Sequence, residues 1–191
     1  MTRWEPNALG RLQRAALELY SERGYDQTTV AEIAKRAGLT ERTFFRYFAD
    51  KREVLFYGSG LLQERLVEGI DDAVPALSPI DAVGAALEAA AGPIEEIRDF
   101  SLRRQAIIAA NPELQERELI KLAALAAAVA DALRKRGVPD PAASLAAEAG
   151  LAVFKIAFQR WLGGDGDSGK QTLAQLIRQS LAELKSVTTG S

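Results

Sequence analysis

The chain has 191 residues, 48% of them hydrophobic, and a formal net charge of −2, which predicts a globular protein with a packed core. It contains neither cysteine nor histidine, and this excludes disulfides, Cys/His zinc sites, Ser-His-Asp triads and cysteine nucleophiles. No run of about 18 apolar residues and no apolar leader are present, so we expect a cytoplasmic protein without a membrane partner.

Glycine and proline divide the chain into segments with helical periodicity, and no segment shows sustained strand alternation. The prolines fall at helix starts or in connections, where a missing N–H is harmless. We therefore predict an all-α protein of about nine helices. The predicted helices cover residues 7–23, 30–37, 41–47, 51–73, 79–91, 94–109, 112–136, 141–163 and 169–185.

The first three predicted helices have the signals of a helix-turn-helix. Gly24 stops the first helix, and Thr28 or Thr29 can cap a short second helix. Gly38 closes that helix in the left-handed conformation, and Thr40 caps a third helix after a turn of only a few residues. Because this order of elements is the signature of the motif, we predict an N-terminal three-helix bundle.

The third helix is predicted to have two different faces. Phe44 and Phe48 are four residues apart and share the side that packs on the first helix, while Phe45 lies on a flank. The opposite side combines charge, hydroxyl groups and an aromatic ring, supplied by Arg42, Thr43, Arg46 and Tyr47. Residues 35–52 include six basic and two acidic side chains, whereas residues 57–191 carry a net charge of −4. A cationic face of this kind is suited to phosphate contact and base readout in a major groove.

The run TTVAEIAKRAGLTERTFFRYFADKREVL, residues 28–55, resembles the DNA-binding domain of TetR-type transcriptional regulators. It matches T-x-x-x-I-A-x-x-A-G-[VL]-S/T, then a T-[LF]-[YF]-x-[HY]-F core, then a lysine and an acidic residue. The resemblance implies phosphate contacts from Thr29, Thr40, Tyr47 and Lys51. It implies base contacts from Arg42, Thr43 and Arg46. Phe45 replaces a frequent tyrosine of the family, which leaves an apolar contact, for example with a thymine methyl.

Members of this family share a helical C-terminal domain that dimerises and usually binds a small effector. The resemblance assigns residues 1–50 to DNA binding and residues 51–186 to ligand binding and dimerisation. The predicted helix 141–163 is apolar on two faces, so it must be covered from both sides, and a second subunit is one source of cover. A thick core within one chain is the alternative. The predicted dimer interface comprises Ala146, Ala149, Val153, Ala157, Leu173, Leu176, Ile177, Leu181 and Leu184.

The C-terminal runs LRRQAIIAANPELQERELIKLAALAAAVADAL and GVPDPAASLAAEAGLAVFKIAFQRWL resemble the mycofactocin-regulator-like subgroup of the family, which implies acyl-CoA-like ligands. On the predicted helix 94–109 a guanidinium lies among apolar groups, where it could pair with an anionic ligand head. The predicted pocket comprises Phe100, Arg104, Ile107, Phe154, Phe158 and Trp161. The alternative is a salt bridge from Arg104 to Glu116 or Glu118, with the aromatic residues as ordinary core.

We therefore expect a sequence-specific DNA-binding transcriptional regulator. The main hypothesis is a homodimeric repressor that reads an inverted-repeat operator and is released by an apolar or acyl-CoA-like effector. The alternative is a DNA-binding interaction or architectural factor without a small-molecule effector. We expect no enzymatic activity, no cofactor and no metal site. The loop GGDGDSGK, residues 163–170, nearly matches a phosphate-binding loop, but Gln171 replaces the serine or threonine that binds magnesium.

Overall fold

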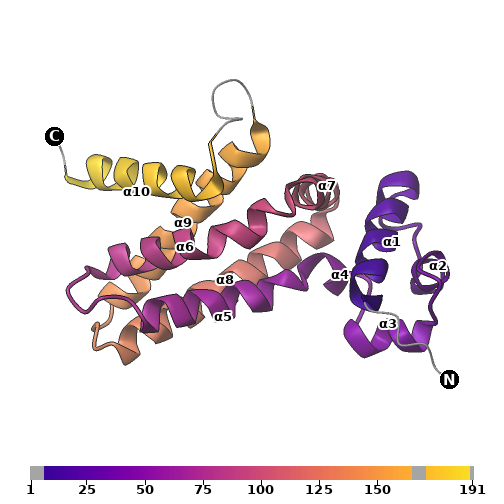
Figure 1. Cartoon of the computed structure of the whole chain (residues 1–191), viewed down its shortest axis with the longest axis horizontal. Coiled ribbons are helices and arrows are strands. Elements are labelled where there is room, and N and C mark those ends of the chain that lie inside the picture. The colour runs from indigo at the N-terminus through magenta and orange to yellow at the C-terminus, as the bar shows by residue number, and fades with distance from the viewer. Residues whose placement is uncertain (1–6, 165–170, 190–191) are drawn as a thin grey trace. The chain divides into compact units, whose positions relative to one another are not determined.

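The computed structural model describes residues 7–164 and 171–189, so most of the Gly/Asp-rich loop at 163–170 lies outside the described residues. The described residues form ten helices and no strand, and the predicted all-α fold is confirmed. The helices, labelled in Figure 1, are α1 (Ala8–Arg23), α2 (Val30–Arg36), α3 (Glu41–Tyr47), α4 (Glu53–Phe56), α5 (Gly58–Asp71), α6 (Pro79–Glu95), α7 (Arg98–Ala109), α8 (Pro112–Lys135), α9 (Ala142–Gly163) and α10 (Leu173–Thr189).

One expected helix is interrupted, which accounts for the difference between nine and ten. The helix expected over 51–73 divides at Tyr57 into α4 and α5. Tyr57 keeps right-handed helical dihedrals, with φ −55° and ψ −38°, so the interruption is one residue long. Gly58 follows directly and Gly60 lies two residues further on, and the low helix propensity of glycine weakens this junction. In addition, α6 continues past Pro93 instead of ending before it.

The chain divides into two compact units. Unit 1 comprises the residues up to Gly58 together with residues 99–119, and unit 2 comprises residues 59–98 together with the chain from Ile120 onward. Most of α7 and the first two turns of α8 therefore belong with the N-terminal helices. The predicted domain boundary after residue 50 stays a prediction.

The core of unit 1 lies around α1, which packs on α2 and α4. Its largest fully buried side chains come from α1, α2, α3, α7 and α8, namely Leu12, Leu19, Ile33, Phe44, Ile108 and Leu114. Apolar residues of α7 and α8 thus complete the core on which the three N-terminal helices rest.

In unit 2, α6, α9 and α10 pack against one another (Figure 1). Glycines allow the closest approaches. A Cβ atom on Gly150 would lie 2.3 Å from Cγ1 of Val83, and one on Gly84 would lie 2.4 Å from Cδ2 of Leu181. Such distances are far below van der Waals contact, so a side chain at either glycine would force its neighbour to shift, and the helices approach closely at these two points.

The 22-residue helix α9 is long and apolar enough to cross a membrane by composition alone, with a mean hydropathy of 1.2 over 18 residues. Of that window, 44% is buried inside the fold. The buried side chains include Ala147, Val153 and Ala157, which belong to the core of unit 2. This helix is therefore a core helix of unit 2.

Candidate nucleic-acid interface

The N-terminus of α2 is fixed by a reciprocal cap. Thr29 Oγ1 accepts a hydrogen bond of 3.2 Å from the Glu32 backbone N–H, and Glu32 Oε2 accepts one of 2.9 Å from the Thr29 backbone N–H. The bond from the Thr29 backbone, followed by that from its side chain, lowers the pKa of Glu32. Of the two threonines that the sequence offers as caps, the structure therefore uses Thr29.

The turn between α2 and α3 has the geometry that a helix-turn-helix requires. Gly38 has φ +66°, the left-handed conformation that glycine adopts readily. Its N–H donates to Lys35 O at 3.0 Å, and the Leu39 N–H donates to Ala34 O at 2.8 Å, which together form a Schellman motif. The guanidinium of Arg11 donates to the carbonyl of Ala37, so α1 also holds this turn.

The recognition helix α3 has one buried and one exposed face. Phe44 is 0% exposed and packs on Phe48 with ring centroids 5.2 Å apart, whereas Phe45 is 54% exposed. Thr40 caps the helix by accepting from the Thr43 N–H at 3.2 Å. The outward side includes the exposed Arg42 and Arg46 and the half-buried Thr43 and Tyr47. The predicted division of the aromatic residues between core and surface is thus the one observed.

Ion pairs decide which cations of this region are available. Arg36 pairs with Glu22 at 2.8 Å, and Arg52 pairs with Asp50 at 2.7 Å, so both charges are locally balanced. Arg46 donates to the Tyr47 hydroxyl at 3.0 Å and has no ion pair among the described residues. The same part of the chain supplies no hydrogen bond or ion pair to the side chains of Lys35 and Arg42. Among the described residues, no ion pair balances the exposed charges of Lys35, Arg42 and Arg46, so these side chains can meet phosphate or base edges.

Lys51, a predicted phosphate contact, lies in a different environment from these cations. Its Nζ donates to the carbonyl oxygens of Tyr25 at 2.9 Å and Thr28 at 3.1 Å, and it reaches that of Asp26 at 3.3 Å. The side chain is half-buried. Its predicted contact with DNA stays a prediction.

Three of the predicted pocket residues lie in unit 1. Ile107 is buried in the core and Phe100 is half-buried against it. Arg104 Nη1 forms an ion pair with Glu118 Oε1 at 3.1 Å, and its Nε donates to Leu55 O at 2.6 Å. Burial lowers the pKa of Arg104, and the charge of Glu118 opposes this shift. The sequence left two roles open for Arg104, contact with an anionic ligand or a salt bridge to Glu116 or Glu118, and the ion pair with Glu118 corresponds to the second.

The other three predicted pocket residues form an aromatic row on α9 in unit 2. The Phe154 and Phe158 rings are stacked at 5.7 Å, and those of Phe158 and Trp161 lie 5.7 Å apart. The guanidinium of Arg98 stands 5.6 Å from the Trp161 ring and donates to Trp161 O at 3.1 Å. Sequence reasoning missed Arg98, because a partner 63 residues away leaves no local signal.

Most residues of the predicted dimer interface are buried by other helices of the same chain. Ala157, Leu173, Leu176 and Ile177 are 0% exposed, and Val153 is 3% exposed. Only Ala149 and Leu184 among the predicted nine are more than slightly accessible. A second subunit is therefore not needed to explain the apolar faces of α9 and α10, and the predicted interface stays a prediction.

Two short helices joined by a glycine turn, the second with an exposed cationic face, define a helix-turn-helix DNA-binding protein. The family model described as "Bacterial regulatory proteins, tetR family" matches residues 12–57, and that described as "MftR C-terminal domain" matches residues 77–189, more than half of the chain. The chain belongs to the tetR family of transcriptional regulators and has an MftR-type C-terminal domain. The family predicted from residues 28–55 is confirmed, and it is a family of DNA-binding regulators without enzymatic activity.

Two curated relatives illustrate the similarity. The HTH-type transcriptional regulator TcmR of Streptomyces glaucescens is 34% identical over 86 residues, which are 45% of this chain but only 38% of that protein. A candidate mycofactocin biosynthesis transcriptional regulator, MftR of Mycobacterium tuberculosis, is 28% identical over 164 residues, 83% of this chain and 81% of that protein. The second match extends over both parts of the chain.

Solved structures of similar fold include two complexes. FadR of Thermus thermophilus, a tetR-family transcriptional repressor in complex with lauroyl-CoA, is 26% identical, covers 93% of each chain and has a TM-score of 0.56. FadR of Bacillus subtilis, in complex with stearoyl-CoA, is 21% identical, covers 92% of this chain and 96% of that chain, and has a TM-score of 0.63. At its lower identity, the second structure supports the fold alone.

Proposed function

We propose that this regulator is a cytoplasmic homodimeric repressor that places two α3 helices in successive major grooves of an inverted-repeat operator. The observation that supports it is the division of α3 into a buried aromatic face and an exposed cationic face. A two-fold dimer reads half-sites about one helical turn, or a multiple of it, apart. Base contacts are proposed for Arg42, Thr43, Phe45 and Arg46. Phosphate contacts are proposed for Thr29, Thr40 and Tyr47.

We propose that dimer contact uses an accessible apolar stripe of α9. Leu145 is 66% exposed, Ile156 is 50% exposed, and the accessible Ala149 and Ala152 lie on the same helical face between them. Ile156→Asp is expected to convert the dimer to a monomer in light scattering and to weaken operator binding. Lys155→Asp, which changes the neighbouring exposed residue, is the control. A dimer that survives Ile156→Asp contradicts this surface.

The proposed effector is an acyl-CoA or a similar apolar anion. Support comes from the lauroyl-CoA complex of the Thermus thermophilus relative, which is 26% identical over 93% of this chain. We assign contact with the apolar tail to the aromatic row Phe154, Phe158 and Trp161. To move the protein from mostly bound to mostly released, the ligand must bind the released state about 10⁴-fold more tightly than the DNA-bound state.

The test has two stages. A duplex is first selected from a random library with the full-length protein, and its consensus is expected to be an inverted repeat. Lauroyl-CoA is then added to the protein–duplex complex at moderate salt, and fluorescence anisotropy is expected to fall as DNA is released. Free coenzyme A is the control, since it lacks the acyl tail. Absence of any selected consensus contradicts the operator proposal.

The alternative function, a DNA-binding interaction factor without an effector, predicts a different result in the second stage. In that case, neither acyl-CoAs nor lipophilic compounds change DNA binding or the melting temperature. Phe158→Ala separates the two functions further. It is expected to weaken release by lauroyl-CoA while leaving DNA binding intact if the aromatic row contacts the ligand.

A further inference from the structure

Backbone carbonyl groups of the loop that precedes α2 surround the ammonium group of Lys51. Lys51 Nζ donates to the carbonyl oxygens of Tyr25 and Thr28 at 2.9 and 3.1 Å, and to that of Asp26 at 3.3 Å. A lysine ammonium has three N–H donors and no acceptor. All three donors are therefore directed at the backbone of this loop.

Other contacts fix both ends of Lys51. The Tyr20 hydroxyl donates to the Lys51 carbonyl at 2.6 Å, which anchors its backbone to α1. The ammonium stands 4.2 Å from the centroid of the buried Tyr25 ring, and the hydroxyl of that tyrosine donates to Glu113 Oε1 at 2.9 Å. The lysine thus joins the segment after α3 to the loop before α2, within unit 1.

This loop determines where α2 begins. The Thr28 N–H donates to Tyr25 O at 3.2 Å, and the buried Thr28 side chain donates to Gly24 O at 2.8 Å. The next residue, Thr29, opens the capping box of α2, and α2 packs on the recognition helix α3. A displacement of residues 25–28 would therefore move the start of α2 and the helix that reads DNA.

We propose that Lys51 is a positioning residue for DNA recognition, which orders residues 25–28 and acts on DNA through α2 and α3. This role differs from the phosphate contact that the family resemblance implies. A phosphate-binding lysine needs N–H donors that are free to reach the DNA backbone. The exposed side chains of Arg42 and Arg46, by contrast, make no contact with a backbone carbonyl among the described residues.

The salt dependence of DNA binding separates the two roles. The logarithm of the affinity for duplex DNA falls linearly with the logarithm of the salt concentration, with a slope of about 0.9 for each phosphate neutralised. Full-length Lys51→Met is expected to bind the library-selected duplex about tenfold more weakly at every salt concentration between about 50 and 200 mM, with an unchanged slope. The wild-type protein, measured with the same duplex, establishes DNA binding independently of this inference.

Lys51→Arg is the second variant, because it keeps the positive charge. A planar guanidinium does not match three carbonyl oxygens that converge on one point, so this variant is also expected to lose affinity. Amide hydrogen exchange at Thr28 is expected to accelerate in both variants. The control is Arg46→Met, which removes a proposed base contact from α3 and is expected to weaken binding to the selected duplex while leaving exchange at Thr28 unchanged.

Two outcomes would overturn the proposal. If Lys51→Met lowers the slope by about 0.9 for each phosphate that is no longer neutralised, while Lys51→Arg keeps wild-type affinity, Lys51 binds phosphate directly. If Lys51→Met lowers the melting temperature but binds DNA normally at a temperature where it is fully folded, the residue serves stability alone. Weaker binding with an unchanged slope and faster exchange at Thr28 supports the positioning role.

Discussion

The helices of the helix-turn-helix in unit 1 and those of the bundle α6, α9 and α10 in unit 2 are stabilised by different interactions. In unit 1, α2 and α3 have seven residues each, too few for much stability of their own. Polar groups therefore fix their ends: threonine caps at the N-termini, and Arg11 at the turn. In unit 2, α9 has 22 residues and is held by apolar packing and close approach at Gly150. The short helices α2 and α3 thus depend on particular hydrogen bonds at their ends, whereas the long helix α9 depends on close packing of complementary apolar surfaces.

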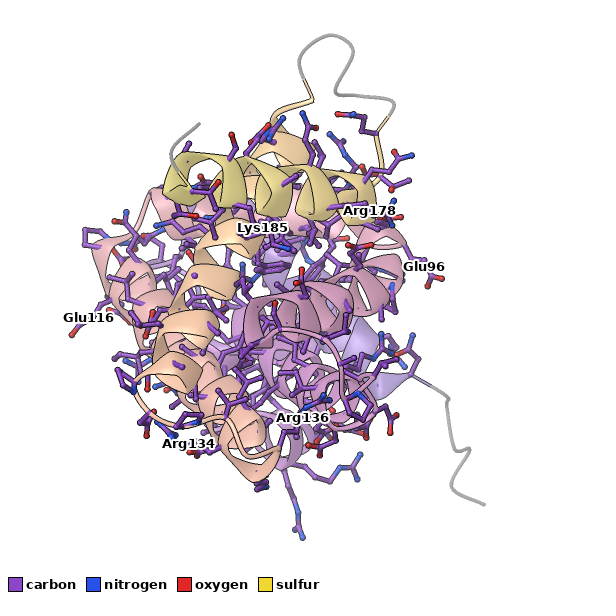
Figure 2. The ribbon with its side chains drawn as sticks, turned by 90° about the vertical axis from the view of Figure 1, so that its left-hand side faces the viewer. Glu96, Glu116, Arg134, Arg136, Arg178 and Lys185 are labelled. Atoms are coloured by element: carbon purple, nitrogen blue, oxygen red, sulfur yellow. The ribbon has the colours of Figure 1, made fainter. Side chains whose placement is uncertain are left out.

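Surface ion pairs accompany the packing in unit 2 without replacing it. Figure 2 shows Arg178 and Lys185 projecting from α10. Arg178 pairs with Glu88 on α6 at 2.5 Å, and Lys185 pairs with Asp81 of the same helix. Because three of these four side chains are about one-third or more exposed to solvent, they are expected to stabilise the bundle far less than the interlocked core.

Both regions use arginines to satisfy carbonyl groups at helix C-termini. Arg11 serves α2, Arg104 donates to Leu55 O near the end of α4 at 2.6 Å, and Arg136 donates to Ala73 O just after α5 at 2.8 Å. Arg98 serves α9 in the same way. The last carbonyls of a helix have no partner within it, and a cation there also complements the helix dipole.

The largest expected effect is loss of the aromatic anchor of α3. Phe44→Ala removes a fully buried ring and is expected to lower the free energy of unfolding by about 3–5 kcal/mol and to abolish DNA binding. Phe45→Ala is the matched control, since its ring is exposed, and its effect on stability is expected within about 0.5 kcal/mol. Urea unfolding measures both variants. Equal losses for the two phenylalanines would contradict the assignment of faces.

The packing of unit 2 is tested by adding one methyl group. Gly150→Ala is expected to cost about 1–3 kcal/mol, because the new Cβ would lie 2.3 Å from Val83 Cγ1. Gly60→Ala adds the same group to α5, where nothing lies within 4 Å, and is expected to stabilise by about 0.5–1 kcal/mol. Thermal unfolding distinguishes the two. A neutral Gly150→Ala would show that α6 and α9 are not closely interlocked.

The dependence of short helices on their caps is tested at Thr40. Thr40→Ala removes the acceptor for the Thr43 N–H and is expected to cost about 1 kcal/mol. Thr40→Ser keeps the hydroxyl and is expected to retain most of the stability. Chemical denaturation supplies the free energies. If serine is as damaging as alanine, packing of the threonine methyl, rather than capping, is the cause.

The smallest expected effect concerns pH and a surface pair. The hydrogen bonds from Lys185 and Ser78 lower the pKa of Asp81. Its contribution is therefore complete above the ordinary aspartate value of about 3.9 and is lost as the pH falls through the lowered value. Lys185→Met is expected to cost about 0.2–1 kcal/mol near pH 7, and this difference is expected to shrink in acid. A cost that does not depend on pH would contradict the ion pair.

Features that depend on near neighbours were predictable. Thr40, Gly38 and the spacing of Phe44 and Phe48 indicated the turn, the cap and the buried face of α3, because a cap or a helical face involves residues within four positions. The family pattern in residues 28–55 extended this to DNA binding. The division of residues 51–73 into two helices was not predicted. The break is confined to Tyr57, which keeps helical dihedrals, so it interrupts the helical pattern of the sequence very little.

Features that depend on residues far apart in the sequence could not be predicted. The apolar faces of α9 and α10 look the same in sequence whether a neighbouring helix or a second chain covers them, and folding buries Leu176 and Ile177 within one chain. The charge of Lys51 likewise reads as a DNA contact until its carbonyl partners, 23 to 26 residues away, come into view.

Local residue patterns alone thus established an all-helical chain, its helix-turn-helix and the family to which it belongs. Only the folded chain decided which cations face solvent, which helix C-termini receive hydrogen bonds from arginines and which apolar stripes are already covered. The physical reason is range: caps and helical faces arise from bonds a few residues apart, whereas ion pairs and core contacts join side chains that folding brings together from distant parts of the sequence.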